Sequence, residues 1–575
     1  MTKFNLSRKY SKVVLFLLLP LLILGLFAFI SNKINKGASA APYTEISTRV
    51  TIGNSSPTFS AGPAESPATS ATAPAAIGAV ITYSATATDS NAESYYLLIC
   101  RTNSATPGSG GSAPTCAASQ TLCTSTVTAS GTGTSCTYTT VVGDSWSNAW
   151  YAFVCDNNST SAACSASSQG TGDSGSPLYV NHAPAFTAST VSSAVDPGGT
   201  ITWGSTASDP DGNTVKLIVC KTAGISAGAC DGGAGDTWCT SSLTTSDPTC
   251  SYVTPNPYAD GTYAAYTYIV DQFNLASAGV AQGADKTYTV NNTTPSVSSV
   301  TLNSGSAISL TESTTTNVPM TAVITDTNGC TNQSATDEIT SVKGYLYRSS
   351  VTYASCDTSG EANANNCYPE VSCSVSVTCS NGVTTYSCTA SVNHYADSTV
   401  ASTQYPSDTW KNSIKATDDD AAVGTTEITT GVELNAIVGG DTTPTLLDYG
   451  TLAVGAANNP LDKELTTTPT GNVGLDVLIK ANTANMCTDY STCTGGTPIP
   501  ITYQKYALAA STSYASGTAL STTDTEAELN VQKQTSATVP SKKTYWGIQI
   551  PTGTIAGVYN GLNTLTYIMG ETANW

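Results

Sequence analysis

Apolar and small polar residues alternate along most of this chain with a period of two. Threonine, valine, tyrosine and isoleucine carry the alternation, for example in residues 81–89 and 201–209, and clusters of glycine, asparagine, aspartate and proline separate such stretches. Successive side chains of a β-strand point to opposite faces, so the pattern is typical of half-buried strands. After residue 30 no stretch sustains the 3.6-residue period of a helix. The pattern therefore predicts an all-β chain of many short strands, arranged as tandem sandwiches.

The exception is an uncharged apolar segment at residues 13–30, which follows a basic leader. As a helix it would measure about 27 Å, close to the ~30 Å hydrocarbon core of a bilayer, so its length fits a signal peptide or a membrane anchor. Residues 38–40 have the small-residue spacing that signal peptidase needs. We expect residues 1–41 to be one or the other. In both cases the rest of the chain lies outside the membrane, because a basic leader stays on the cytoplasmic side.

A short strand-like stretch that ends in a turn and a proline occurs four times, at Pro57, Pro184, Pro295 and Pro444. A proline after such a turn cannot join a central ladder, so it fits the crossover from one module to the next. Each interval is long enough for a sandwich of about 100 residues with insertions. We therefore expect a linker and four sandwich domains in an elongated array, with these bounds: 42–54, 55–181, 182–292, 293–438 and 439–575.

The first two modules also agree in register. Residues 81–89 match residues 201–209, and in both copies a cysteine, Cys100 or Cys220, stands eleven residues after the final aspartate. The third module keeps the strand but carries a tyrosine in place of that cysteine, so it is a divergent copy.

An aromatic residue follows a short acidic turn near the end of each of the first three modules, namely Trp146, Tyr263 and Trp410. A large ring at such a position contributes most when it fills the space between two sheets. We expect core filling, with a platform for stacking sugars as the alternative.

Composition favours an exported protein and argues against a nucleic-acid partner. The formal net charge is −19, which repels phosphate backbones and makes a nucleic-acid partner improbable. Charged residues make up only 11% of the chain, against about 25% in ordinary domains. A polar but weakly charged surface is common among secreted wall and surface proteins.

Eighteen cysteines fall in even-numbered clusters, which indicates that each cluster closes its own bridges outside the cytoplasm. Comparison of the first two modules predicts local loops, although a crossed arrangement of the four shared cysteines stays open. Zinc fits poorly, because zinc sites combine closely spaced cysteine pairs, often with histidine. The cluster from Cys330 to Cys388 stays unassigned. The predicted bridges are Cys100–Cys116, Cys123–Cys136, Cys155–Cys164, Cys220–Cys230, Cys239–Cys250 and Cys487–Cys493.

Calcium is the one cofactor that the residues suggest. Asp209, Asp211 and Asn213 alternate like oxygen ligands, and Asp271 follows a late strand at a place that could face them. Hard cations take six to eight such oxygens. Residues 418–420, three consecutive aspartates, are another candidate contributor. The alternative is a capped, solvated turn.

No catalytic constellation emerges from the sequence. Residues 172–177 resemble the nucleophile motif of trypsin-like serine proteases, but no histidine precedes Ser174, so the base that would activate it is missing. Phosphate loops, metalloprotease helices and nucleotide fingerprints are absent. No acidic pair is marked by a motif for glycoside hydrolysis. We expect a protein that is not an enzyme.

Residues 183–213, with Asp-Pro-Gly-Gly-Thr at 196–200 and Asp-Pro-Asp-Gly-Asn at 209–213, resemble the opening half of bacterial immunoglobulin-like and cadherin-like repeats of cell-surface proteins. The resemblance is good over residues 183–291, fair over residues 55–180 and weak over residues 294–432. Short motifs at 470–474 and 550–559 resemble the β-sandwich that closes many bacterial envelope proteins. This resemblance implies immunoglobulin-like domains and a role in display, spacing and adhesion.

The expected function is therefore a non-enzymatic, extracellular cell-surface protein with an adhesive or structural role, whose partner is a surface glycan or protein. It would touch a membrane only through residues 13–30. Two alternatives stay open: a secreted polysaccharide-active enzyme with accessory sandwich modules, and a subunit of a filament or sheath.

Overall fold

The computed structural model describes residues 44–575 except for 171–174, 331–337 and 359–362. The hydrophobic segment 13–30, the predicted cleavage site and Ser174 lie outside these residues. The part of the chain that the structure describes contains no helix with the length and hydrophobicity of a membrane span.

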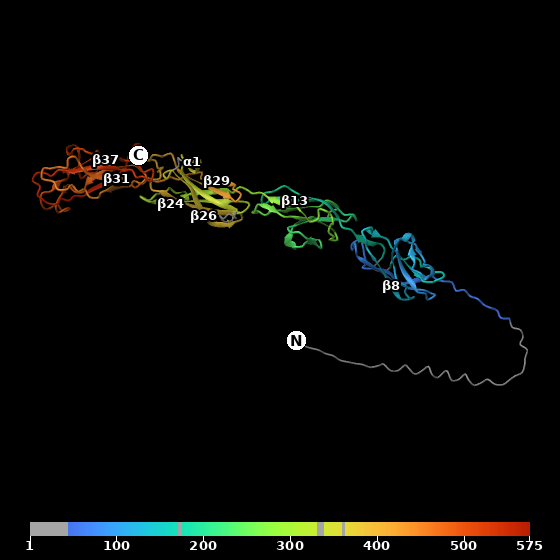
Figure 1. The fold of residues 1–575 in the computed structure, drawn as a ribbon. Coiled ribbons are helices and arrows are strands. Elements are labelled where there is room, and N and C mark those ends of the chain that lie inside the picture. Colours follow the sequence, from blue (N-terminus) through green and yellow to red (C-terminus); the bar gives the residue numbers. More distant parts are fainter. Residues whose placement is uncertain (1–43, 171–174, 331–337, 359–362) are drawn as a thin grey trace, which may run out of the picture. The chain divides into compact units, whose positions relative to one another are not determined.

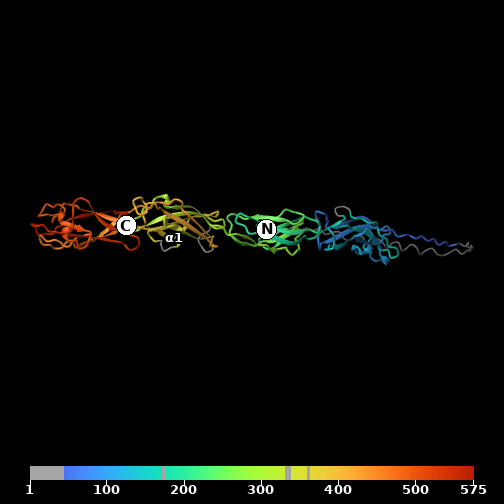
Figure 2. The same cartoon turned by 90° about the horizontal axis from the view of Figure 1, so that it is seen from above.

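Strands dominate the described chain, as Figure 1 shows. Its one α-helix is α1 (Tyr353–Thr358), which contacts β25 (Ile339–Arg348) and β26 (Cys367–Ser380) and is labelled again in Figure 2. The predicted all-β class of tandem sandwiches is confirmed. The domain boundaries given above stay predictions.

By its internal contacts the chain divides into two compact units. Of the described residues, the first comprises 44–64, 83–137 and 151–170, and the second comprises 65–82, 138–150, 175–330, 338–358 and 363–575.

The first unit contains two three-stranded sheets, which we call the first sandwich. A hairpin of two short strands, β5 and β6, lies in the loop that follows β4. The sheets have the orders β1-β3-β8 and β10-β4-β7, and the strands are β1 (Thr58–Ser66), β3 (Val80–Thr88), β4 (Tyr95–Cys100), β5 (Ala105–Thr106), β6 (Thr115–Cys116), β7 (Thr121–Thr124), β8 (Gly133–Thr139) and β10 (Tyr151–Asp156).

Burial in the first sandwich follows the sequence pattern. Alternate residues of β3 are buried, from Ile81 to Ala87. In β4, by contrast, residues 97–100 are all buried. Leu98 and Cys100 point into a small separate cluster with Cys116, so the disulfide loop covers the face of this sheet that would otherwise meet water.

The second unit begins with a small sheet of order β2-β11-β9 and continues with the second sandwich, whose sheets have the orders β12-β13-β18 and β17-β14-β20-β21. A short hairpin, β15-β16, and a short antiparallel pair, β19-β22, accompany them. The strands are β2 (Ala75–Ala76), β9 (Ser147–Asn148), β11 (Leu178–Asn181), β12 (Ala185–Val191), β13 (Thr200–Ser208), β14 (Val215–Cys220), β15 (Ile225–Ser226), β16 (Ala229–Cys230), β17 (Thr237–Thr240), β18 (Thr249–Val253), β19 (Gly261–Tyr263), β20 (Tyr266–Asp271), β21 (Ala284–Asp285) and β22 (Tyr288–Val290).

In the third sandwich one long strand, β26, belongs to both sheets and joins them. Residues 367–372 of β26 pair with β25, whereas residues 373–380 pair with β27, so the hydrogen-bonded order is β23-β24-β27-β26-β25-β28-β29. The other strands are β23 (Ser296–Leu302), β24 (Thr315–Thr325), β27 (Val383–Asn393), β28 (Trp410–Asp418) and β29 (Val423–Glu427).

The fourth sandwich has sheets of order β30-β31-β38-β35-β36 and β37-β32-β39, with a short β33-β34 pair. Trp546 is fully buried between them. The strands are β30 (Gly440–Thr443), β31 (Lys463–Pro469), β32 (Leu475–Ala481), β33 (Asn485–Met486), β34 (Ile499–Pro500), β35 (Gln504–Ala507), β36 (Thr518–Ala519), β37 (Thr525–Val531), β38 (Lys542–Ile548) and β39 (Asn563–Met569).

All eighteen cysteines are paired in nine disulfides. Six of these are the predicted bridges, which closes the question of a crossed arrangement in the first two modules. The cluster that the sequence left unassigned forms Cys330–Cys379, Cys356–Cys367 and Cys373–Cys388.

Candidate functional site

Three parts of the chain place two aspartates and one asparagine in the same arrangement, which we call a triad. The first aspartate directly follows β3, β13 or β24, and the second aspartate ends β10, β20 or β28. The asparagine lies in the junction segment that precedes β1, β12 or β23. The first triad is Asn54, Asp89 and Asp156, the second is Asn181, Asp209 and Asp271, and the third is Asn292, Asp326 and Asp418.

The hydrogen bonds repeat as well. In each triad the asparagine Nδ2 donates to Oδ2 of the second aspartate, at 2.8, 2.6 and 3.1 Å in the first, second and third triads. Oδ1 of the first aspartate accepts from the backbone N–H two residues later, at 2.6, 2.8 and 2.8 Å. This is the local bond by which aspartate favours turns at a strand end.

Each triad leaves one carboxylate oxygen without a partner. Oδ2 of Asp89, Asp209 and Asp326 is buried and accepts no hydrogen bond in the structure, and these residues are only 7, 9 and 1% exposed. A buried charged oxygen without a donor is costly. The three positions are therefore candidate sites for a cation.

The four residues predicted to bind calcium converge at the second triad, around Asn181. Asp209 and Asp271 belong to the triad, Asn213 donates from Nδ2 to Asn181 Oδ1 at 3.1 Å, and Asp211 lies against His182. Sequence reasoning missed both Asn181 and His182 as members of this cluster, although both lie in the junction stretch that precedes Pro184.

Most of these oxygens already accept from N–H groups. His182 uses its backbone N–H and Nδ1 on Asp211, at 2.6 and 2.9 Å. Oδ1 of Asp271 accepts from the backbone N–H of Phe273 and of Leu275, each at 2.8 Å. Apart from Asp209 Oδ2, the arrangement is that of a capped turn.

The third triad carries additional carboxylates. Oxygen atoms of Asp260, Glu338 and Asp419 lie within 4.8 Å of one another. Burial, followed by the charges of Asp326 and Asp419, raises the pKa of Glu338 to about 8. Burial also raises the pKa of Asp326 to about 6. Of the predicted residues 418–420, Asp418 belongs to this triad and Asp419 to the added group.

The first triad gains one carboxylate, Glu93, whose oxygen lies within 4.8 Å of those of Asp89 and Asp156. Glu93 Oε1 accepts from Asn158 Nδ2 at 2.6 Å, and its Oε2 is buried without a partner.

In the fourth sandwich a buried amide after β31, and not a triad, binds the segment that precedes β30. Asn472 is fully buried. Its Oδ1 accepts from the backbone N–H of Ile437 at 2.7 Å, and its Nδ2 donates to the carbonyl of Asn435 at 3.0 Å.

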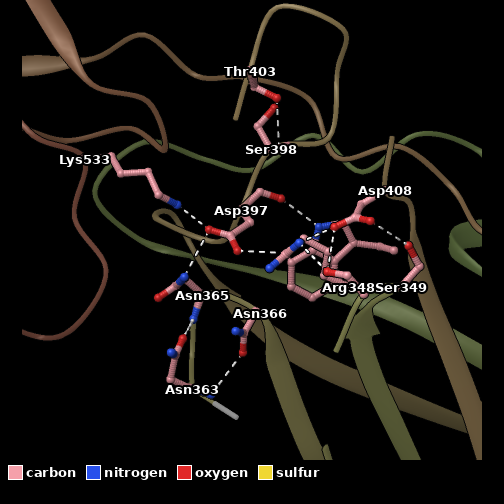
Figure 3. A network of polar contacts seen from close by, with 12 residues as sticks. Arg348, Ser349, Asn363, Asn365, Asn366, Asp397, Ser398, Thr403, Asp408 and Lys533 are labelled. Carbon is pink, nitrogen blue, oxygen red and sulfur yellow. Dashed lines mark hydrogen bonds and ion pairs between the residues drawn. The ribbon is translucent and has the colours of Figure 1, made fainter. Parts of the chain in front are cut away.

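A second polar cluster joins the third sandwich to the segment after β37, as Figure 3 shows. The fully buried Asp397 accepts from Arg348 Nε and from Asn365 Nδ2, each at 3.0 Å, and from Lys533 Nζ. Arg348 also pairs with Asp408 and lies over the ring of Tyr405 at 3.6 Å. Asp408 and Tyr405 therefore also belong to this cluster.

This cluster is built for structure rather than for acid–base chemistry. Two cations face two carboxylates, so the charges balance, and each carboxylate accepts from at least one cation. Paired and hydrogen-bonded charges are the form in which proteins tolerate buried ions.

The predicted core aromatics differ from one another. Trp410 is fully buried and donates from Nε1 to the carbonyl of Asp397 at 2.7 Å, so core filling is confirmed there. Tyr263 is partly exposed and stacks between Tyr258 and Tyr288, at centroid distances of 4.9 and 5.1 Å.

For Trp146 the prediction of core filling is wrong. It is partly exposed and stacks on Phe273 of the second sandwich at 6.0 Å, whereas Trp150, four residues later, is fully buried. The acidic turn before Trp146 directs that ring to the neighbouring segment, and the core position falls one turn later.

No family model matches the chain, and no curated protein matches it. Among solved structures, a marsupial T cell receptor has 11% identity and a TM-score of 0.26, and covers 64% of this chain and 99% of its own. The ectodomain of mouse nectin-like molecule 4 has 11% identity and a TM-score of 0.25, with 62% and 96% covered. The FN1–FN3 domains of chicken CNTN1 have 10% identity and a TM-score of 0.16, with 60% and 93% covered. Likeness at these TM-scores carries no argument, and the fold class rests on the strands of this chain.

Proposed function

We propose that this chain is a non-enzymatic, extracellular or cell-surface protein whose tandem sandwiches present a binding face for adhesion or structural display. The observation that carries the proposal is the complete pairing of eighteen cysteines. Disulfides form and persist in oxidising compartments such as the cell exterior, and are rare in the cytosol.

The disulfide loops support stability outside the cell in a specific way. In the second sandwich, Cys220 and Cys230 pack with Ile218, Tyr268 and Val270 over one face of β14 and β20. The first sandwich repeats this arrangement around Cys100 and Cys116. Each covering loop is short and closed by a bridge, which limits the entropy of its unfolded state.

Contacts at the module junctions support a display role. Asn181 and Asn292 tie junction segments to buried aspartates, and Lys533 inserts into a buried ion network. Such contacts favour successive sandwiches that hold each other in place. The partner proposed is a surface glycan or another protein, and a net charge of −19 argues against nucleic acid.

Calcium at Asp209, Asp211, Asn213 and Asp271 is part of the proposal. Its support is the unpartnered Asp209 Oδ2. Binding there requires Asp211 and Asp271 to exchange N–H donors for the ion. Asp209→Asn should then weaken calcium binding by the whole chain, and unchanged binding would remove this site from the proposal.

The proposal is tested on intact cells that make the full chain. Added protease should cleave it without lysis, its cysteines should resist alkylation unless reduced first, and a deletion strain should bind less to glycan-coated surfaces or partner cells. Protein found inside the cell with reduced thiols would contradict the location, and unchanged binding by the deletion strain would contradict the adhesive role.

The same material separates the alternatives. Turnover of a polysaccharide that a single carboxylate substitution abolishes would favour the secreted enzyme. Filaments of the purified chain under negative stain would favour an assembly subunit.

A further inference from the structure

Four carboxylates gather where the second sandwich meets the third. Asp260 directly precedes β19, Asp326 follows β24, Glu338 precedes β25, and Asp419 follows β28. Oxygens of Asp260, Glu338 and Asp419 lie within 4.8 Å of one another. Asp326 is not one of these three, but after burial its charge is the largest cause of the raised pKa of Glu338.

Two hydrogen bonds join the second and third sandwiches at this point. The N–H of Tyr258 donates to the carbonyl of Thr327 at 3.0 Å, and Asn328 Nδ2 donates to the carbonyl of Tyr258 at 3.3 Å. Because Tyr258 lies two residues before Asp260, these bonds hold the Asp260 segment against the turn that carries Asp326.

Two of the four carboxylates present unpartnered oxygens in a buried setting. Glu338 is 8% exposed and its Oε1 has no hydrogen-bond partner, and Asp326 is 1% exposed and its Oδ2 has none. None of the ion pairs formed by the described residues involves any of the four. The group thus gathers carboxyl groups that no cationic side chain of the described residues pairs with.

We propose that Asp260, Glu338 and Asp419 together bind one divalent cation of the calcium class at the junction of the second and third sandwiches, with the buried carboxylate of Asp326 beside them. Every ligand is a carboxylate oxygen, which hard cations prefer, and three carboxylates with two oxygens each supply up to six of the six to eight oxygens that calcium takes. Zinc prefers sulfur and nitrogen ligands, and none of the four residues offers one. The inference does not rest on the proposed adhesive role.

The ion would act as a clamp. Asp260 belongs to the second sandwich, and Glu338 and Asp419 belong to the third, so the cation would join the two by ligands from both sides. A ligand that binds only the folded, docked arrangement stabilises it by mass action.

The second triad explains why this site differs from the one that the sequence suggests. There the carboxylate of Asp211 lies against His182, which donates through its backbone N–H, so the extra negative charge already has a partner. At the third triad the extra carboxylates, Glu338 and Asp419, have no such partner.

The test is calcium titration by calorimetry of the full purified chain after treatment with a chelator. Glu338→Gln keeps the shape and removes the charge, and it should weaken calcium binding at one site by about tenfold or more. The matched control is Asp420→Asn, which removes the same charge from the next residue along the chain but outside the three ligands. The charge of Asp420 helps to raise the pKa of Asp260, so this variant should weaken the site far less than Glu338→Gln.

Thermal unfolding is a second measurement, which tests the proposal even if a variant disturbs folding. Because the Glu338 carboxylate repels its neighbours, Glu338→Gln should raise the melting temperature in chelator while removing the increase that calcium causes in the natural chain. A chain that binds no calcium, or one for which Glu338→Gln leaves binding unchanged, overturns the proposal. An equal loss in Glu338→Gln and Asp420→Asn overturns it too, since that pattern reflects general charge rather than ligation.

Discussion

Glu338 has a carboxyl group whose charged form its surroundings disfavour. Burial and the carboxylates of Asp326, Asp419, Asp260 and Asp418 raise its pKa to about 8, well above the usual value near 4.3. Between these two values the folded chain holds a proton that the unfolded chain has released. By linkage, the free energy of unfolding falls as the pH rises through this window.

The resulting prediction concerns pH in the absence of metal. In chelator, the melting temperature of the segment that includes the third sandwich should fall between pH 6 and 8, above the pKa of about 6 of Asp326, and Glu338→Gln should flatten this fall. The measurement is a series of melts across that range, with Asp420→Asn as the control. A fall of the same size in Glu338→Gln would show that another group causes it.

Asn181 is the residue that completes the second triad. Asn181→Ala would leave Asp271 Oδ2 and Asn213 Nδ2 without their partner, and unsatisfied buried polar groups cost about 1–3 kcal/mol each. We expect a destabilisation of about 2 kcal/mol in denaturant unfolding. Asn291→Ala is the control, because Asn291 makes a similar bond to Asp196 on the exposed surface. Equal effects of the two substitutions would contradict a special role for the buried bond.

At the residue scale, sequence spacing predicts only part of the site. Asp209, Asp211 and Asn213 stand close together and mark themselves by alternation. Asp260 and Glu338 lie in separate connections without a motif, and only the docking of two sandwiches brings them together. The asparagines of the triads were visible in the junction stretches, but their role depends on partners about a hundred residues away.

At the scale of elements, strands were the most predictable feature because alternation directly reports which face is buried. The disulfides of the first two sandwiches were predictable because duplication limits the pairings. The third sandwich lacks that guide. Its bridge Cys373–Cys388 joins directly opposed residues of β26 and β27, and this pairing depends on a register that the sequence does not show.

The bridge Cys220–Cys230 offers a prediction at this scale. Replacing both residues by alanine opens a loop that packs on Ile218, Tyr268 and Val270. A bridge that closes a loop of this size stabilises the fold by about 3 kcal/mol, because it lowers the entropy of the unfolded chain. Without the bridge, the second sandwich should unfold at a clearly lower denaturant concentration. The comparison is the double alanine variant of Cys487–Cys493, which should lower the denaturant concentration at which the fourth sandwich unfolds instead. If both variants weaken the same transition, the bridges do not act on their own sandwiches.

For the whole molecule, repeated junction stretches predicted a chain of similar modules but not what holds neighbours together. Junctions use different chemistry at different places. The third triad gathers carboxylates, whereas the fourth sandwich binds its preceding segment through the buried amide of Asn472 and contacts the third through Lys533. Composition cannot distinguish these solutions, since the same residue types also occur on the solvated surface.

Lys533 permits the sharpest test of coupling between neighbours. It is 6% exposed, and Lys533→Met keeps the length and apolar volume of the side chain but removes the charge that faces Asp397. Removal of one partner from a buried ion pair costs about 3–5 kcal/mol, and Arg348 still pairs with Asp397, so we expect about 3 kcal/mol. Because the contact joins two sandwiches, calorimetry should show their transitions separating rather than one transition shifting. Lys543→Met is the control, since Lys543 pairs with Glu464 at the exposed surface, where ion pairs contribute little. A single transition that shifts as a whole would mean that the network stabilises the third sandwich alone.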